Sequence, residues 1–363
     1  MKASVKLLSA AVILAGMATQ TQAISLGEFD GTQVSVGGYI KATGAFNKPD
    51  ADATDPTGVD LDNSFMGDAR ESRLNVAASS EVDGHKIKGF IEGDFWGGYY
   101  ASSAYSWRLR HAYLQVDNFK VGQTWGGQFF SAALFDGEML TMWGRSLGTL
   151  AGNGGTVRPV GLHYASKGLR VSLQDPINDD ASIPDTIVSY TFGSKKGPAL
   201  NLAAYARDVA NGEENDMGTG FSLGAKLPVG SGEFKATAYT GTGLAVYSGV
   251  GVGGAYNPAT VAAFDAENGE LVSQVGYSVA YKHQISPKLR ATLRRGAIMV
   301  DDEAESGVVI HSFNMVYNYL PKVELGFEAR KQSLGTHNTP STSNFPNVRP
   351  KGQQLEVMAK YKF

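Results

Sequence analysis

The sequence predicts an all-β fold, a 16-stranded antiparallel transmembrane β-barrel with short periplasmic turns and long extracellular loops. Three observations support this prediction. Sixteen segments alternate apolar and polar residues, which is the pattern of a strand with two different faces. The connections between the segments alternate between tight turns and long loops. The polar faces of the segments carry many charged side chains, as expected where they line a water-filled interior.

The first residues have the pattern of a secretory signal peptide. Lys2 and Lys6 supply a positive start, residues 7–18 form an apolar run, and Thr21-Gln22-Ala23 is a small-residue cleavage site. We therefore expect residues 1–23 to be removed and residues 24–363 to form the barrel in the outer membrane of a Gram-negative bacterium. After the signal peptide the sequence contains no run of 18 or more apolar residues, so no membrane-spanning helix is predicted.

The composition fits many short strands and excludes several classes of protein. There are 45 Gly against 13 Pro, with 16 Tyr and 17 Phe, as expected for strands with bulges and aromatic ends. The absence of cysteine excludes a disulfide framework and thiolate metal sites. The formal charge of −3 becomes −5 when Lys2 and Lys6 are removed, which is too mild to indicate a nucleic-acid partner.

The order of strands and turns follows from the alternation. The predicted strands cover residues 33–46, 69–82, 86–97, 105–116, 119–126, 157–165, 168–175, 184–193, 199–207, 217–227, 233–245, 270–285, 288–300, 307–320, 322–333 and 352–363. Every second connection is tight, as at Asp83-Gly84, Asp117-Asn118 and Ser286-Pro287. A soluble β-sandwich, the alternative fold, gives no reason to sort its connections in this way.

The two faces of the strands also favour a membrane barrel. In the last strand Leu355, Val357 and Ala359 share one face, and Glu356 and Lys360 share the other. Aromatic residues recur at the turn-side ends of the apolar faces, as in an interfacial girdle. They are Tyr190, Phe192, Tyr281, Tyr317, Tyr319, Tyr361 and Phe363.

Charged residues on the polar face cluster between residues 70 and 125. If Asp83-Gly84 is a two-residue hairpin turn, Arg73 lies opposite Asp94. The next hairpin then places Asp94 opposite Arg108 and Glu92 opposite Arg110. Each carboxylate would be held between guanidinium groups, which bind carboxylates bidentately.

More basic residues share the parity of the polar face on distant strands. They are Arg170, Arg207, Lys282, Arg290, Arg294 and Arg330, and the acidic residues against them are Glu324, Glu328 and Glu356. This balance predicts an anion-attracting interior, in which these residues and the cluster around Asp94 line the solute path. The alternative is that the arginines are neutralised by neighbours and brace the wall.

The same stretch resembles a known family. ARESRLNVAASSEVDGHKIKGFIEGDFWGG followed by WRLRHAYLQVDNFKVGQTWG is similar to a block of the DcaP-like outer-membrane porins. Arg73, Glu92, Asp94, Arg108 and Arg110 match that family's motif over about 55 residues. The resemblance implies a trimer of 16-stranded barrels that favours small anionic, dicarboxylate-like solutes.

The longest predicted loop covers residues 127–156 and contains many apolar side chains, among them Phe129, Phe135 and Trp143. So much apolar surface should not face water, and the third long loop of general porins folds into the interior. This loop is the third, so we expect it to form a constriction lined by Asp136, Glu138 and Arg145. A flap packed on neighbouring subunits is the alternative.

Metal and catalytic sites have little support in the sequence. Five aspartates fall between residues 50 and 62, but their spacing lacks a calcium-loop pattern, so a solvated surface loop is expected. The six histidines are dispersed and no serine lies in a nucleophile elbow. His111 and His311 share parity with outward apolar residues, which indicates packing at a subunit contact, or a bulge near His111.

The sequence therefore predicts a passive diffusion channel for small hydrophilic solutes, with a preference for anions, and no enzyme, cofactor or metal. A porin with little charge preference and an outer-membrane barrel enzyme are the alternatives. The expected partners are small anionic solutes, outer-membrane lipid and lipopolysaccharide, two further copies in a homotrimer, and the outer-membrane assembly machinery through the C-terminal Phe363.

Overall fold

The structure is a computed structural model of the chain. It describes residues 23–52, 62–97, 106–126, 137–138, 140, 158–176, 181–194, 196–211, 214–244, 247, 265–303, 307–334 and 351–363. The predicted signal peptide lies outside the described residues except for Ala23. Among the described residues no helix is long and apolar enough to cross a membrane.

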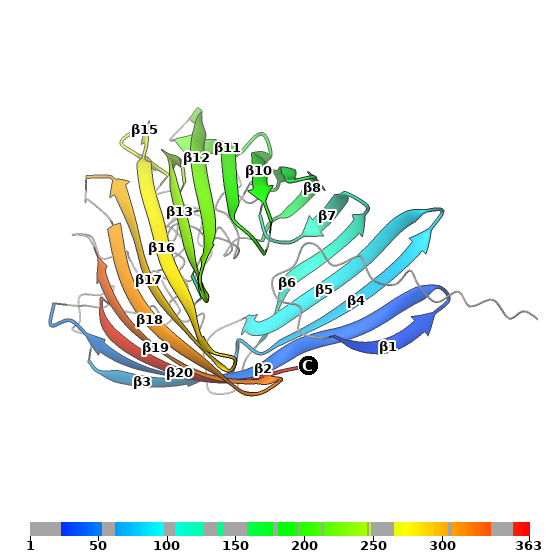
Figure 1. Cartoon of the computed structure of the whole chain (residues 1–363). Coiled ribbons are helices and arrows are strands. Elements are labelled where there is room, and N and C mark those ends of the chain that lie inside the picture. The colour runs from blue at the N-terminus through cyan, green and yellow to red at the C-terminus, as the bar shows by residue number, and fades with distance from the viewer. Residues whose placement is uncertain are drawn as a thin grey trace, which may run out of the picture.

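The chain forms a closed antiparallel barrel of sixteen strands, as predicted (Figure 1). The strands of the first half are β2 (Thr32–Pro49), β4 (Arg73–Val82), β5 (His85–Gly97), β6 (Ser106–Val116), β7 (Phe119–Gln123), β8 (Val160–Ser166), β9 (Leu169–Gln174) and β10 (Asp185–Gly193). Those of the second half are β11 (Ala199–Asn211), β12 (Glu214–Val229), β13 (Gly232–Thr242), β16 (Ser273–Ser286), β17 (Leu289–Asp301), β18 (Gly307–Leu320), β19 (Val323–Leu334) and β20 (Gly352–Lys362).

Strand β2 closes the barrel because it pairs with early and late strands at once. Its first half pairs with β4 and its second half with β20, so the C-terminal end of the chain lies beside it (Figure 1). Two short strands also pair with β2. The strand β3 (Ser64–Asp68) pairs with its second half and continues the line of β4, and β1 (Ile24–Phe29) pairs with its first residues. The sequence pattern did not predict β1.

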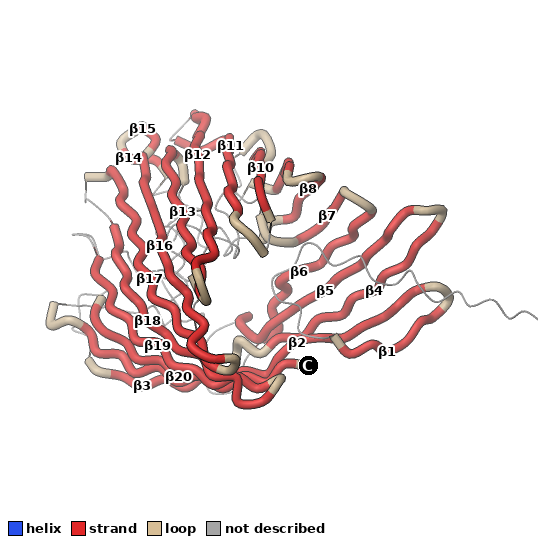
Figure 2. The backbone as a smooth tube through the Cα atoms, viewed as in Figure 1, coloured by secondary structure: helices blue, strands red, loops and turns tan. Residues whose placement is uncertain are grey.

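Tight turns at one end of the barrel follow from their residues (Figure 2). Asp83 and Gly84 have φ angles of 50° and 80°, and Lys167 and Gly168 have φ angles of 47° and 92°. Positive φ at both central residues is the turn geometry that suits the twist of a two-residue hairpin. Asp83-Gly84 was predicted as such a turn, and it sets the register of β4 on β5.

The two faces of the wall differ in the way predicted. Large apolar side chains such as Phe221 and Leu293 are exposed on the outside, at 68% and 62% of their surface. Polar side chains such as Gln174, Asn314 and Glu356 are buried on the inside. Tyr190, Phe192, Tyr317, Tyr319 and Tyr361 are exposed on the outward face towards the tight-turn end, as expected for the aromatic girdle.

A separate small hairpin lies within the connection between β13 and β16. It consists of β14 (Ala266–Glu267) and β15 (Glu270–Leu271), joined through Asn268 and Gly269 in the left-handed region. The sequence pattern placed this segment in a long loop and at the start of the next strand.

Candidate channel interior

The cluster between β4 and β6 has most of the predicted register. Arg73 lies opposite Asp94, and Asp94 lies opposite Arg108. The guanidinium of Arg108 holds Asp94 bidentately, with Nε 2.9 Å from Oδ1 and Nη2 2.6 Å from Oδ2. Arg73 reaches Glu92 instead, at 3.5 Å, although its backbone faces Asp94.

The predicted opposition of Glu92 and Arg110 is wrong by one residue. A β-bulge in β6 places His111 opposite Glu92, and Arg110 becomes the extra residue. Arg110 still points inward, where its Nε lies 3.0 Å from Oε1 of Glu92 and its Nη1 lies 2.8 Å from Oδ2 of Asp94.

The bulge also corrects the outward position expected for His111. Two successive residues, Arg110 and His111, are both buried on the inside, and His111 Nδ1 lies 3.0 Å from the hydroxyl oxygen of Thr124. His311, in contrast, is exposed on the outward face as predicted.

These contacts largely neutralise the cluster. Asp94 is completely buried and Arg110 is 2% exposed, so this pair is closed to a passing solute. Arg108 keeps 25% and Arg73 keeps 18% of their side-chain surface exposed. The alternative that these arginines brace the wall therefore describes Arg110, whereas Arg73 and Arg108 retain an exposed edge.

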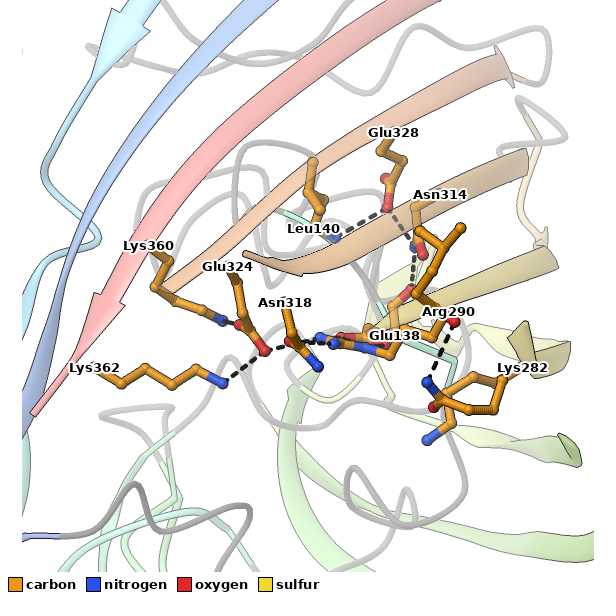
Figure 3. Close-up of polar contacts among 12 residues, drawn as sticks. Glu138, Leu140, Lys282, Arg290, Asn314, Asn318, Glu324, Glu328, Lys360 and Lys362 are labelled. Atoms are coloured by element: carbon orange, nitrogen blue, oxygen red, sulfur yellow. Dashed lines mark hydrogen bonds and ion pairs between the residues drawn. The ribbon is translucent and has the colours of Figure 1, made fainter. Parts of the chain in front are cut away.

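Part of the loop predicted to form the constriction lies against the inner wall (Figure 3). The carboxylate of Glu138 accepts hydrogen bonds from Arg290, with Oε2 2.7 Å from Nε and Oε1 2.6 Å from Nη2. The backbone carbonyl of Glu138 accepts a hydrogen bond of 2.6 Å from Asn314. Asp136 and Arg145 lie outside the described residues.

Leu140 fixes the same segment by backbone and apolar contacts. Its N–H donates to Oε2 of Glu328 at 3.0 Å (Figure 3). Lys41 Nζ donates to the carbonyl of Leu140 at 2.7 Å. The Leu140 side chain is 3% exposed and packs with Val316 and Met358. The described residues of this segment therefore contact inward side chains of strands β16 to β20, which lie far away in sequence.

Beside this segment runs a belt of inward charges. Lys282 contacts Glu233 at 2.8 Å, and Arg290 contacts Glu324 at 3.1 Å. Glu324 also accepts from Lys360 at 2.7 Å and from Lys362 at 2.8 Å (Figure 3). Lys360 and Lys362 were not among the predicted site residues, although their parity in the last strand places them on the polar face.

Three of the arginines predicted to line the solute path are buried. Arg207 has no exposed surface; its Nη1 lies 3.0 Å from Asp265 and 2.7 Å from the carbonyl of Gly243. Arg330 is ion-paired with Glu328, and Arg294 is 3% exposed and lies against the loop segment at Gly137. These positions therefore fit the alternative that inward arginines brace the wall, because loop segments and neighbouring carboxylates cover them.

In a second loop segment, Gly243 and Tyr247 contact the inner wall next to Arg207. The hydroxyl of Tyr247 donates to Asp185 at 2.5 Å and accepts from Gln174 at 2.6 Å. Burial, together with the Asp185 carboxylate, raises the pKa of Tyr247 well above its ordinary value, so the phenol stays protonated as a donor.

Further around the barrel the inward cations have no carboxylate partner among the described residues. Lys88, Lys120 and Arg170 are half-buried on β5, β7 and β9, and none of them forms an ion pair there. Lys120 Nζ lies 4.4 Å from the ring centroid of Tyr113. Arg170 donates to the carbonyl of Trp125 at 3.0 Å.

The strand register places these cations close together on one wall. Lys88 lies opposite Gln115, Gln115 opposite Lys120, and Lys120 opposite His163, whose Nδ1 is 3.3 Å from Arg170 Nη2. We call Lys88, Lys120 and Arg170 the basic wall. Only Arg170 was selected from the sequence, but Lys88 shares the parity of Glu92 and Asp94, which could have identified it.

The described residues contain no group of three or more His, Cys, Asp or Glu placed to hold a metal ion. In the loop after β2, Lys351 pairs with Asp52 and lowers the pKa of that carboxyl. Asp55 and Asp60 lie outside the described residues.

Comparison with known proteins shows what the fold is similar to. No protein-family model and no curated protein matches the sequence. The structure is similar to the outer membrane channel DcaP of Acinetobacter baumannii, with a TM-score of 0.74 and 21% identity over 92% of this chain and 98% of that chain. It is also similar to OmpF of Salmonella typhi, with a TM-score of 0.61 and 12% identity over 94% and 100% of the two chains.

A third similar structure is the trimer form of OmpT, an outer membrane protein of Vibrio cholerae, with a TM-score of 0.57 and 14% identity over 92% and 100% of the two chains. The resemblance to DcaP noted in the sequence is therefore matched by the fold. The chain has the 16-stranded barrel fold of these outer-membrane proteins.

Proposed function

We propose that this chain is an outer-membrane porin, a passive diffusion channel for small hydrophilic solutes. The observation that carries the proposal is the closed barrel with an apolar outside, a charged inside and a loop segment held against its inner wall. The similarity to DcaP and OmpF supports it. A low-dielectric wall that carries charges at several weak sites lets an ion enter and leave.

We further propose that the channel favours anions, including dicarboxylates. The support is the basic wall, because Lys88, Lys120 and Arg170 add positive charge that no described carboxylate cancels. Arg73 and Arg108, which keep an exposed edge, lie on β4 and β6 on either side of β5, opposite Asp94 and six positions along β5 from Lys88. A dicarboxylate can be held by two cations at once, whereas a neutral sugar gains nothing from them.

A channel with little charge preference is the second candidate. The observation that favours it is the pairing of Glu92 and Asp94 with Arg73, Arg108 and Arg110, which cancels most of the positive charge of this cluster. In the first candidate the basic wall speeds the permeation of anions, and in the second candidate it does not.

The test is the permeation of solutes into proteoliposomes. We expect the variant K88Q/K120Q/R170Q to admit succinate on the order of tenfold more slowly than the unaltered protein, with a smaller change for a neutral sugar of similar size. The matched control K196Q/K288Q/K322Q removes three exposed lysines from the tight-turn end and should leave both rates unchanged. Equal losses for both solutes, or no loss, would exclude the anion preference.

We place the barrel in the outer membrane of a Gram-negative bacterium, surrounded by lipid and lipopolysaccharide, and assembled as a homotrimer. The outward surface of β5 and β6 suits a subunit contact, since Phe95 and Trp107 stack there with their ring centroids 5.4 Å apart and remain 40% and 47% exposed. The mass of the detergent-solubilised particle tests the trimer. Ester or lipid hydrolysis by purified protein that shows no conductance would favour the enzyme alternative.

A further inference from the structure

The outward face of the described barrel strands carries few cationic side chains, and these lie in one row. Among the described residues of the barrel strands, Lys48, Arg295 and Lys331 are the only lysines or arginines whose side chains point outward. All three are exposed, and none forms an ion pair with a described residue. A cation on the lipid face costs about 2–4 kcal/mol at the bilayer midplane and close to nothing near the interfaces.

The three cations are not scattered. The register places Lys48 opposite Gln353, Gln353 opposite Lys331, Lys331 opposite His311, and His311 opposite Arg295. One row of side chains therefore crosses five adjacent strands, from β2 through β20, β19 and β18 to β17. With strands about 4.8 Å apart, the row is roughly 19 Å long.

An apolar surface begins directly beside this basic row. Two residues closer to the tight-turn end, the next row consists of Phe46, Leu355, Ala329, Phe313 and Leu293. These large side chains are 39% to 62% exposed. A shallow groove of about 540 Å³ spans both rows and is lined by Lys48, His311 and Lys331 as well as by Phe46 and Phe313.

We propose that this surface binds a phosphorylated lipid of the outer leaflet, with its phosphates on the basic row and its acyl chains along the apolar rows. On β2, β20 and β19 the basic row lies close to the long-loop ends of the strands, beyond the apolar rows, where the head groups of that leaflet would be. Lysine and arginine donors without carboxylate neighbours match phosphate oxygens, and the adjacent apolar groove matches hydrocarbon chains. The inference rests on the proposed position of the barrel in the outer membrane.

The test is native mass spectrometry of the detergent-solubilised protein titrated with bis-phosphorylated lipid A. Each Lys or Arg near an anionic lipid surface contributes about fivefold to binding. We expect K48Q/R295Q/K331Q to bind lipid A on the order of a hundredfold more weakly and the single variant K331Q about fivefold more weakly, with K331R close to the unaltered protein. The variant K88Q/K120Q/R170Q is the matched control, since it removes three cations from the inside and should bind lipid A normally.

Two further probes separate the source of the phosphate. Lipid A without its phosphates should bind no better to the unaltered protein than to K48Q/R295Q/K331Q, and inorganic phosphate at the same concentration should not compete. Equal binding of bis-phosphorylated lipid A by the unaltered protein and by K48Q/R295Q/K331Q would overturn the proposal. If K48Q/R295Q/K331Q no longer formed the oligomer, the proposal would also be overturned, because the basic row would then be a subunit contact. Unchanged conductance of that variant would show that the channel function stands independently.

Discussion

The loop segment that contains Glu138 and Leu140 is held against the inner wall by one ion pair together with backbone hydrogen bonds and apolar contacts, and Glu138→Gln weakens the ion pair alone. Glu138 accepts two charge-assisted hydrogen bonds from Arg290, at 2.7 Å and 2.6 Å. Such bonds contribute about 1.5–3 kcal/mol each when buried. The Glu138 side chain is 28% exposed and that of Arg290 is 15% exposed, so solvent weakens both bonds. We therefore expect the loss of the Glu138 charge to destabilise the contact by about 2 kcal/mol, less than the sum of two buried bonds.

A loss of about 2 kcal/mol raises the population of the released segment by roughly 30-fold. The loop contains Arg145, so limited digestion with trypsin reports on this population when opening is fast relative to cleavage. We expect Glu138→Gln to be cleaved after Arg145 on the order of 30-fold faster, and its single-channel current to show more frequent changes of level. Glu81→Gln, at an exposed residue without an ion pair among the described residues, is the control.

A second variant tests the same contact by another route. A methyl group at Gly137 would lie 2.6 Å from the Ala280 Cβ, so Gly137→Ala should displace the segment without removing a charge. Cleavage and current noise at the unaltered level in both variants would refute the view that this contact holds the loop in place.

Three further predictions concern the wall. A methyl group at Gly93 would overlap the indole ring of Trp107, so Gly93→Ala should lower the free energy of unfolding by about 1–3 kcal/mol in urea titrations, whereas Gly89→Ala on the same strand, with open space around it, should have little effect. Arg110→Ala leaves buried Asp94 and Glu92 short of a partner and should cost about 3–5 kcal/mol of stability, while Arg108→Ala, whose side chain is 25% exposed, should cost less. Arg207→Met should destabilise the fold but leave the ratio of anion to cation permeability unchanged, since Arg207 has no exposed surface; a large change in that ratio would contradict the structural role given to it here.

The strands could be predicted from the sequence because their determinants are local. Alternation at period two and the Asp83-Gly84 turn placed Arg73 opposite Asp94, and the structure has this register. In the pairing of β5 with β6, the bulge at Arg110 shifts the register by one residue from Glu92 onwards. The pair Asp94 and Arg108 was therefore predicted correctly, and the partner of Glu92 was not. A single inserted residue leaves the alternation almost intact, so the pattern could only suggest a bulge near His111 without fixing the partners.

The partners of the inward arginines could not be predicted in the same way. Arg290 meets Glu138 across 152 residues and Arg207 meets Asp265 across 58 residues, in both cases because a loop folds back into the barrel. Loop conformation depends on tertiary contacts that a strand pattern does not contain. Parity correctly indicated that Arg207, Arg290, Arg294 and Arg330 point inward, but whether an inward charge is exposed depends on these distant segments.

The central claim is that uncancelled positive charge on the inner wall makes the channel prefer anions. The most direct measurement is the reversal potential of the unaltered protein in a planar bilayer under a potassium chloride gradient, at low ionic strength where the charges are least screened. We predict a potential with the sign of the chloride equilibrium potential, which decreases in K88Q/K120Q/R170Q. A potential with the sign of the potassium equilibrium potential would contradict the account.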